Sequence, residues 1–220
     1  MFYLKEDKEN PEPLPMVFYA FVIGGLVTFF ALVFQFGVRE YLLFFLSPNN
    51  PFEILVFSGI EEILKFAAVW WFIVPKKSFN EPLDAMVYMV IVALGFAAVE
   101  NITSLGNSTN GLVSGVASLA AFEVLSLRFV GATLLHSLAS AIVGYHWGHA
   151  MVHKTRSVKK GVVIGLVIAI LLHGAFNYLI LLTGPLTWVL SFILFVGFFV
   201  MADFERLHDE EDGAQKALEF

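Results

Sequence analysis

Seven residues with reactive or metal-binding side chains lie inside the long apolar stretches of this 220-residue chain. They are Glu61, Glu62, Lys65, Glu100, His136, His173 and Asn177. A charged side chain near the bilayer centre costs about 2.5–3.5 kcal/mol on insertion scales, so such residues usually face the interior of a helical bundle. The pattern therefore predicts a buried polar site built from several helices.

Spacing within the stretches gives part of the geometry. Glu61 and Lys65 are four residues apart and share a helical face, and Glu62 lies three residues before the same lysine. Lys65 can therefore neutralise one of the two carboxylates and leave the other available for chemistry. His173 and Asn177 are also four apart, so both can point into one cavity.

Two imidazoles and a carboxylate form a suitable ligand set for Zn²⁺, with a fourth coordination position open to water. A further carboxylate can take a proton from that water, and an asparagine amide such as that of Asn177 can donate to a developing oxyanion. These groups together favour hydrolysis of a peptide bond. A glutamate mechanism without metal, in which the histidines bind the oxyanion, remains an alternative. Serine catalysis fits less well, because the chain has no G-x-S-x-G motif.

The composition indicates the solvent in which this site must be built. Apolar residues make up 58% of the chain, 24 positions are phenylalanine, and the mean hydropathy is +0.79. A soluble domain is usually about 45–50% apolar, so we expect the excess to face lipid. The chain has no cysteine, which excludes disulfides and thiolate chemistry. Its net charge of −6 gives no support for nucleic-acid binding.

The expected fold is all-α, a polytopic transmembrane helical bundle. About 20 apolar residues span the hydrocarbon core of a bilayer, and six stretches meet or approach that length. They are Met16–Phe36, Phe52–Val74, Leu83–Ser104, Leu127–His149, Gly161–Leu182 and Leu186–Met201. Two shorter apolar segments, Tyr41–Leu46 and Gly111–Leu125, are expected to form interfacial or re-entrant helices, and the second is a candidate gate for substrate.

The basic residues predict the orientation. With the N-terminus in the cytoplasm, the loops on the inside would hold ten of the thirteen lysines and arginines, and those outside only Arg39 and Arg128. The thirteenth, Lys65, lies within a span. We therefore expect both termini to be cytoplasmic. Residues 1–15 would form an N-terminal segment, residues 16–202 a single transmembrane domain, and residues 203–220 an acidic cytoplasmic tail.

This topology places the polar residues at similar depth. At 1.5 Å per helical residue, Glu61, His136 and His173 would lie about 13 Å below the outer face, and Glu100 about 6 Å below it. Four residues on four helices therefore fall in one layer. A proton- or ion-coupled transporter or channel would instead string such residues along the membrane normal. A non-catalytic membrane scaffold is the other alternative, because polar residues also hold helices together.

The order of these motifs resembles the PrsW family of intramembrane proteases, related to the CAAX prenyl endopeptidases and bacteriocin-processing proteins. Glu61-Glu62-Ile63-Leu64-Lys65 is similar to the family's E-E-x-x-K motif, and Phe96 to Asn101 is similar to F-x-x-x-E-N. The block from Arg128 through His136 to Tyr145, and the stretch His173 to Asn177, resemble its third and fourth motifs. The CAAX endopeptidases carry histidine at the position of Glu100, which argues against a prenylated substrate.

The resemblance implies an intramembrane endopeptidase, a metalloprotease of a bacterial or archaeal plasma membrane, whose substrate is a membrane-anchored protein. Family members are implicated in site-1 cleavage of anti-sigma factors. We expect Glu61 to act as general base, Lys65 to pair with Glu62, and Asn177 to steady the oxyanion. The metal ligands, for Zn²⁺ or another divalent ion, are expected to be Glu100, His136 and His173.

Overall fold

A computed structural model describes residues 12–112, 119–153, 157–181 and 186–216, and these ranges contain helices and short turns without β-structure. Six α-helices and a single π-helical turn account for the secondary structure of the described ranges. They are α2 (Leu14–Tyr41), α3 (Pro51–Ala68), the π-helix η1 (Val69–Ile73), α4 (Pro82–Leu112), α5 (Leu119–Val152), α6 (Val158–Leu181) and α7 (Leu186–Lys216). The prediction of an all-α fold is confirmed.

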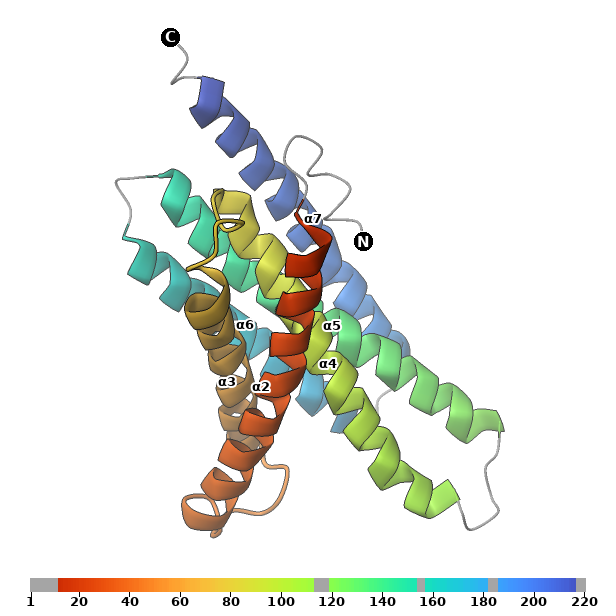
Figure 1. Cartoon of the computed structure of the whole chain (residues 1–220). Helices are drawn as coiled ribbons and strands as arrows, with labels where there is room; N and C mark the ends of the chain where they lie inside the picture. Colours follow the sequence, from red (N-terminus) through yellow and green to blue (C-terminus); the bar gives the residue numbers. More distant parts are fainter. Residues whose placement is uncertain (1–11, 113–118, 154–156, 182–185, 217–220) are drawn as a thin grey trace.

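The helices form one bundle around α4 and α5 (Figure 1). α2 packs on α3 and α4, α6 packs on α3 and α5, and α7 packs mainly on α5. Residues 83–93 of α4 are buried at every position, so this helix forms the centre of the apolar core. Successive helices run in alternating directions, and α2 begins on the same side of the bundle on which α7 ends (Figure 1). We call this the terminal side.

Helix α3, which carries the paired glutamates, has a well-defined start. The Asn50 side chain accepts hydrogen bonds from the backbone amides of Phe52 and Glu53, both at 3.0 Å, and Pro51 occupies the first helical position. This is a favourable N-cap, because two amides without a partner in the helix are satisfied. Arg39 near the end of α2 contacts the Glu53 carboxylate at 2.9 Å and ties the two helices together.

The two short segments expected as separate helices are arranged differently. Tyr41 is the last residue of α2, and residues 42–46 form turns without an independent helix. In the Gly111–Leu125 segment, residues 111–112 end α4 and residues 119–125 begin α5, while residues 113–118 lie outside the described ranges. Both neighbouring helices are longer than their apolar cores, so they include residues that the hydropathy pattern had separated from them.

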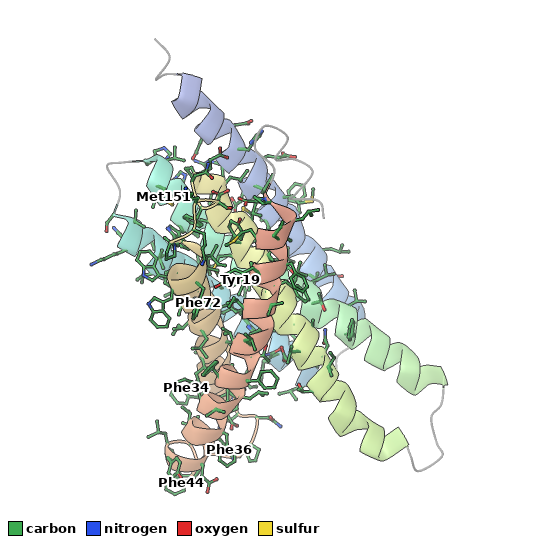
Figure 2. The ribbon with its side chains drawn as sticks, viewed as in Figure 1. Tyr19, Phe34, Phe36, Phe44, Phe72 and Met151 are labelled. Carbon is green, nitrogen blue, oxygen red and sulfur yellow. The ribbon has the colours of Figure 1, made fainter. Side chains whose placement is uncertain are left out.

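The outer surface of the bundle is apolar, as a lipid-facing surface must be. Phe18, Phe30 and Phe36 of α2 each expose more than 60% of their surface, and Figure 2 labels Phe34 and Phe36, two of the exposed phenylalanines of this helix. In water such a surface would be strongly unfavourable, whereas lipid tails solvate it without cost. The chain is therefore an integral membrane protein.

Four helical segments in the described residues are long and apolar enough to cross a bilayer: Leu14–Tyr41, Pro82–Ser104, Phe129–Val152 and Val158–Leu181. They match four of the six predicted spans. The predicted span Phe52–Val74 corresponds to α3 and η1, and its four charged residues reduce its apolar character. The predicted span Leu186–Met201 is the first half of α7.

Two glycines allow α2 to approach α4 closely. A Cβ atom added at Gly24 would overlap the backbone carbonyl of Val92, and one added at Gly95 would overlap the carbonyl of Phe21. Small residues at such crossings are typical of helices packed in membranes. Because Gly95 lies five residues before Glu100, this crossing also fixes the position of α4 beside the polar site.

Candidate active site

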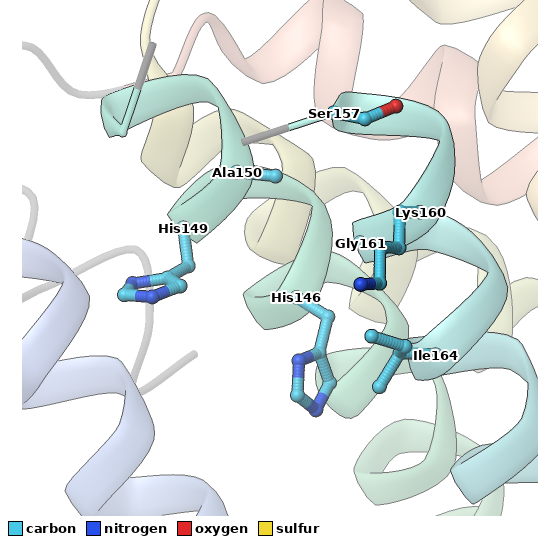
Figure 3. A pocket seen from close by; sticks show the side chains of 7 residues that line it. All are labelled: His146, His149, Ala150, Ser157, Lys160, Gly161 and Ile164. Carbon is cyan, nitrogen blue, oxygen red and sulfur yellow. The ribbon is translucent and has the colours of Figure 1, made fainter. Parts of the chain in front are cut away.

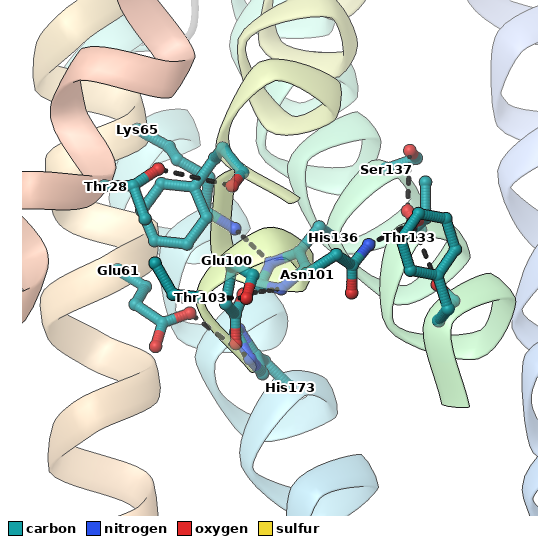
Figure 4. A network of polar contacts seen from close by, with 12 residues as sticks. Thr28, Glu61, Lys65, Glu100, Asn101, Thr103, Thr133, His136, Ser137 and His173 are labelled. Carbon is teal, nitrogen blue, oxygen red and sulfur yellow. Dashed lines mark hydrogen bonds and ion pairs between the residues drawn. The ribbon is translucent and has the colours of Figure 1, made fainter. Parts of the chain in front are cut away.

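Six of the seven predicted site residues converge between four helices, and Figure 4 shows all of them except Glu62. α3 supplies Glu61, Glu62 and Lys65, α4 supplies Glu100, α5 supplies His136, and α6 supplies His173. The side chains of Glu62, Lys65 and the two histidines are at most 2% exposed. The convergence expected from similar depth in the membrane is therefore present in the fold.

Lys65 is paired with Glu62, as we expected. The Lys65 Nζ atom lies 2.6 Å from Glu62 Oε1, and both side chains are fully buried. Lys65 also lies over the ring of Phe96, 5.1 Å from its centroid. A buried ion pair of this kind has to be kept intact, because either charge alone would be left without compensation in a medium of low dielectric constant.

Glu62 also orients His173. Nδ1 of His173 lies 2.7 Å from Glu62 Oε1, and a carboxylate can only accept a hydrogen bond. The proton of the neutral ring therefore lies on Nδ1, and the lone pair lies on Nε2. That atom faces Glu61 Oε2 at 3.5 Å. Carboxylates hold metal-binding histidines in this way in many metalloenzymes.

Glu61 is held by a residue that the sequence pattern did not indicate. Nε2 of Gln35, from α2, donates a 2.7 Å hydrogen bond to Glu61 Oε1. Oε2 of Glu61 is buried and makes no hydrogen bond to the part of the chain that the structure describes. One oxygen is thus fixed by Gln35, and the other points toward the imidazoles with its lone pairs available.

His136 lies between Lys65 and Glu100. Its Nδ1 atom is 3.1 Å from Lys65 Nζ, and its Nε2 atom is 2.6 Å from Glu100 Oε2. An ammonium group can only donate, so this arrangement places the proton of a neutral His136 ring on Nε2, facing Glu100. The rings of His136 and His173 meet edge to face with centroids 4.8 Å apart.

The donor atoms are suitable for a metal ion. Glu61, His136 and His173 each offer a ligand atom, and these three atoms lie within 4.8 Å of one another. Two ligands of a tetrahedral Zn²⁺ ion lie about 3.3–3.5 Å apart, which matches the 3.5 Å between Glu61 Oε2 and His173 Nε2. Ligation by Nε2 of His136 would require its proton to move to Nδ1 and the contact with Lys65 to rearrange. Zn²⁺ therefore fits Glu61 and His173 directly and His136 after that change.

The remaining polar side chains near the site have different positions. Asn177, expected to steady an oxyanion, lies one turn after His173, is half-buried, and makes no hydrogen bond within the described ranges. Asn101 donates to Thr133 Oγ1 at 2.9 Å and joins α4 to α5. Ser140 contacts Glu62 Oε2 at 3.4 Å, and Ser137 donates to the backbone of its own helix. Neither serine is paired with His136 as a serine nucleophile would be.

An intramembrane metallohydrolase requires carboxylates and imidazoles that face one another in the interior of a helical bundle, and this site has both. Residues 12–202 match the family model described as the PrsW family intramembrane metalloprotease. The match covers most of the 220 residues, and the chain belongs to this family. This membership confirms the predicted class of enzyme over the transporter and scaffold alternatives.

Several curated proteins that are similar to this chain carry the name of the same family. The chain is 29% identical over 202 residues to Protease PrsW of Bacillus subtilis (strain 168), covering 90% of this chain and 84% of the relative. It is 31% identical to Protease PrsW of Geobacillus kaustophilus (strain HTA426), covering 82% and 73%. Protease PrsW of Clostridioides difficile (strain 630) is 24% identical over 83% of this chain and 74% of the relative. No solved structure matches the chain.

Proposed function

We propose that the site between α3, α4, α5 and α6 hydrolyses a peptide bond in a membrane-anchored protein. The observation that carries this proposal is the cluster of Glu61, His136 and His173, whose ligand atoms lie within 4.8 Å of one another in the buried interior. A divalent ion held there, Zn²⁺ being suited to these donors, would acidify water and polarise the scissile carbonyl group.

His136 and His173 are the proposed histidine ligands, and Glu61 and Glu100 divide the roles of third ligand and general base. The sequence favours Glu61 as base and Glu100 as ligand. The geometry supports the opposite division as well, because Glu61 belongs to the three-residue cluster. The Glu100 side chain is 35% exposed, whereas that of Glu61 is 10% exposed. In both versions Glu62 positions His173, and Lys65 neutralises Glu62. Asn177 is the proposed hydrogen-bond donor to the oxyanion.

The two versions can be separated by measuring metal and activity together. Purified protein in detergent would be analysed for bound zinc and assayed on a membrane-anchored protein substrate, beside Glu61→Gln, Glu100→Gln, His136→Ala and His173→Ala variants. The ligand glutamate loses both zinc and cleavage on substitution, whereas the base loses cleavage and retains zinc. Full activity in Glu61→Gln and His173→Ala would refute the catalytic assignment.

The same experiment tests whether His136 binds the metal or the oxyanion, and an active protein without bound metal would favour the metal-free glutamate mechanism. If its proton stays on Nε2, His136 donates a hydrogen bond to the substrate oxyanion, and His136→Ala retains zinc while losing activity. If His136 is a ligand, the variant loses both. The contact between His136 Nδ1 and Lys65 at 3.1 Å is the observation that makes this distinction necessary.

For the substrate we propose a membrane-anchored protein such as an anti-sigma factor, which is what the family resemblance suggests. For the topology we propose six crossings, with both termini in the cytoplasm of a bacterial or archaeal cell. The support is that α2 begins and α7 ends on the same side of the bundle (Figure 1), where Lys76, Lys77, Lys159 and Lys160 lie beside the ends of η1 and α6.

The absence of cysteine allows a direct topology test. Ser47 and Ser157 are both exposed and lie in turns at opposite ends of the bundle. Ser47→Cys should react with a membrane-impermeant maleimide in intact cells or spheroplasts, whereas Ser157→Cys should react only after lysis. Labelling of both sites in intact spheroplasts, or the reverse pattern, would refute the proposed orientation.

A further inference from the structure

A second group of metal-binding side chains lies on the terminal side of the bundle, away from the site between α3 and α6. His149 belongs to the last turn of α5, His153 follows that helix directly, and Glu210 lies near the end of α7. Each offers one ligand atom, and these three atoms lie within 4.8 Å of one another. We propose that His149, His153 and Glu210 form a separate binding site for a divalent transition-metal ion, with Zn²⁺ as the best-suited ion.

The spacing of the two histidines is that of a helical chelate. His149 and His153 are four residues apart, and the amide of His153 donates to the carbonyl of His149, so the turn of helix continues through both. Their ring centroids are 4.4 Å apart. Two histidines at this spacing on one face of a helix can bind the same zinc ion.

The His153 ring is set in the tautomer that a ligand needs. Its Nδ1 atom lies 3.1 Å from the backbone carbonyl oxygen of His149, which can only accept a hydrogen bond. The proton of neutral His153 is therefore on Nδ1, and Nε2 carries the lone pair. A backbone carbonyl that accepts from the second ring nitrogen is a typical support for metal-binding histidines.

Glu210 contributes the third ligand from a different helix. Its Oε2 atom lies 2.6 Å from His149 Nδ1 and 3.8 Å from His153 Nδ1, so the carboxylate faces this nitrogen of both rings. Because a carboxylate only accepts, His149 donates from Nδ1 here, and a metal ion would displace that proton or bind the rings through Nε2. The other oxygen, Oε1, accepts from Arg206 at 3.0 Å.

Packing between the helices fixes this carboxylate in place. Phe204 and Leu207 of α7 are buried, and Glu210 follows Leu207 by three residues on the same face. A Cβ added at Gly148 of α5 would press on the Leu207 side chain, so the two helices meet closely at this level. Figure 3 shows the ring of His149 directed from α5 toward the neighbouring helix.

Water and ions can reach this part of the protein. A cavity of about 360 Å³ lies between α5 and α6, and its lining includes His146, His149 and Lys160 (Figure 3). The His153 side chain is 39% exposed. The neighbouring cavity and the exposure of His153 distinguish this site from the buried cluster around Glu61.

The test uses full-length protein in which the other site has been disabled. The His173→Ala protein, purified in detergent and freed of metal with a chelator, would be titrated with Co²⁺ followed by its visible absorption, and with Zn²⁺ by calorimetry. We expect it to bind one ion per chain at neutral pH. Adding His153→Ala or Glu210→Gln to this protein should abolish that binding, whereas His208→Ala, a substitution of a half-buried histidine on α7, should leave it unchanged.

Several outcomes would overturn the proposal. One is the absence of binding to the His173→Ala protein while the unmodified chain binds one ion, and another is binding that persists in His153→Ala and in Glu210→Gln. In those cases the three residues form only a hydrogen-bonded ion pair between α5 and α7. Because the readout is metal binding in a protein without the catalytic histidine, the result is independent of the proposed peptidase function. His153→Ala removes an exposed side chain, so its effect cannot be attributed to unfolding of the core.

Discussion

Nδ1 of His173 lies 2.7 Å from Oε1 of Glu62, and Nζ of Lys65 lies 2.6 Å from the same oxygen atom. One carboxylate oxygen thus sets the tautomer of a histidine on α6 and neutralises a lysine on its own helix. This arrangement makes Glu62 a positioning residue, because its side chain is fully buried behind His173 and the opposite ring nitrogen faces Glu61.

Glu62→Gln should lower both metal affinity and cleavage while His173 itself is still present. An amide can still accept from His173, but it no longer carries the charge that makes the ring a stronger ligand. Loss of such a supporting carboxylate typically costs about 10- to 100-fold in metal affinity or activity. Zinc titration and cleavage of a membrane-anchored substrate measure the two effects. Ser140→Ala, which removes only the long 3.4 Å contact to Glu62, is the matched control and should change neither appreciably.

Lys65→Met should destabilise the fold strongly, because it leaves the Glu62 carboxylate buried and unpaired. Breaking a buried pair by removing one partner typically costs about 3–5 kcal/mol. The double substitution Lys65→Met with Glu62→Leu should recover most of this loss and still be inactive, since nothing then orients His173. Unfolding in mixed micelles and a cleavage assay separate the two results. A double variant no more stable than Lys65→Met would contradict this account.

Much of the site was predictable because charged residues in lipid have few structural solutions. Glu61, Glu62 and Lys65 had to face other helices, and helical spacing placed both glutamates within reach of Lys65. Alternating topology then brought His136 and His173 to the same level. Gln35 could not be found in this way, because glutamine in an apolar helix carries no charge and belongs to no motif. Only the packing of α2 against α3 shows that its amide reaches Glu61.

Helix ends were predicted less well than helix centres. The apolar pattern ends the third span at Ser104, whereas α4 continues through polar residues to Leu112. Backbone hydrogen bonds continue beyond the apolar stretch, and a hydropathy pattern does not detect them. The division of roles that we expected, with Glu61 as base and Glu100 as ligand, stays a prediction, because both carboxylates lie near the imidazoles and their distances allow either role.

Gln35→Leu should slow catalysis without unfolding the protein. It removes the 2.7 Å hydrogen bond that fixes one oxygen of Glu61. Hydrogen bonds to charged groups contribute about 1.5–3 kcal/mol, which corresponds to roughly a 10- to 100-fold fall in rate if the effect is on the transition state. We expect kcat to fall while KM changes little. Thr28→Val on the same helix is the control, because Thr28 bonds to the Phe96 carbonyl at 3.2 Å and does not contact Glu61.

The close crossing of α2 and α4 makes a prediction about both stability and cleavage. Gly95→Ala places a methyl group against the carbonyl of Phe21, and the two helices must separate to accept it. Overpacking of this kind typically costs about 1–3 kcal/mol. Gly37→Ala is the matched control, because nothing lies within 4 Å of a Cβ at that position of α2. Alanine there should leave stability unchanged or raise it by up to about 1 kcal/mol, since it favours helix over glycine. Unfolding in mixed micelles measures the stability of both variants. Because separation of α4 from α2 also moves Glu100, cleavage should fall in Gly95→Ala and not in Gly37→Ala. Equal stability of the two variants would show that the helices are not as close as the structure places them.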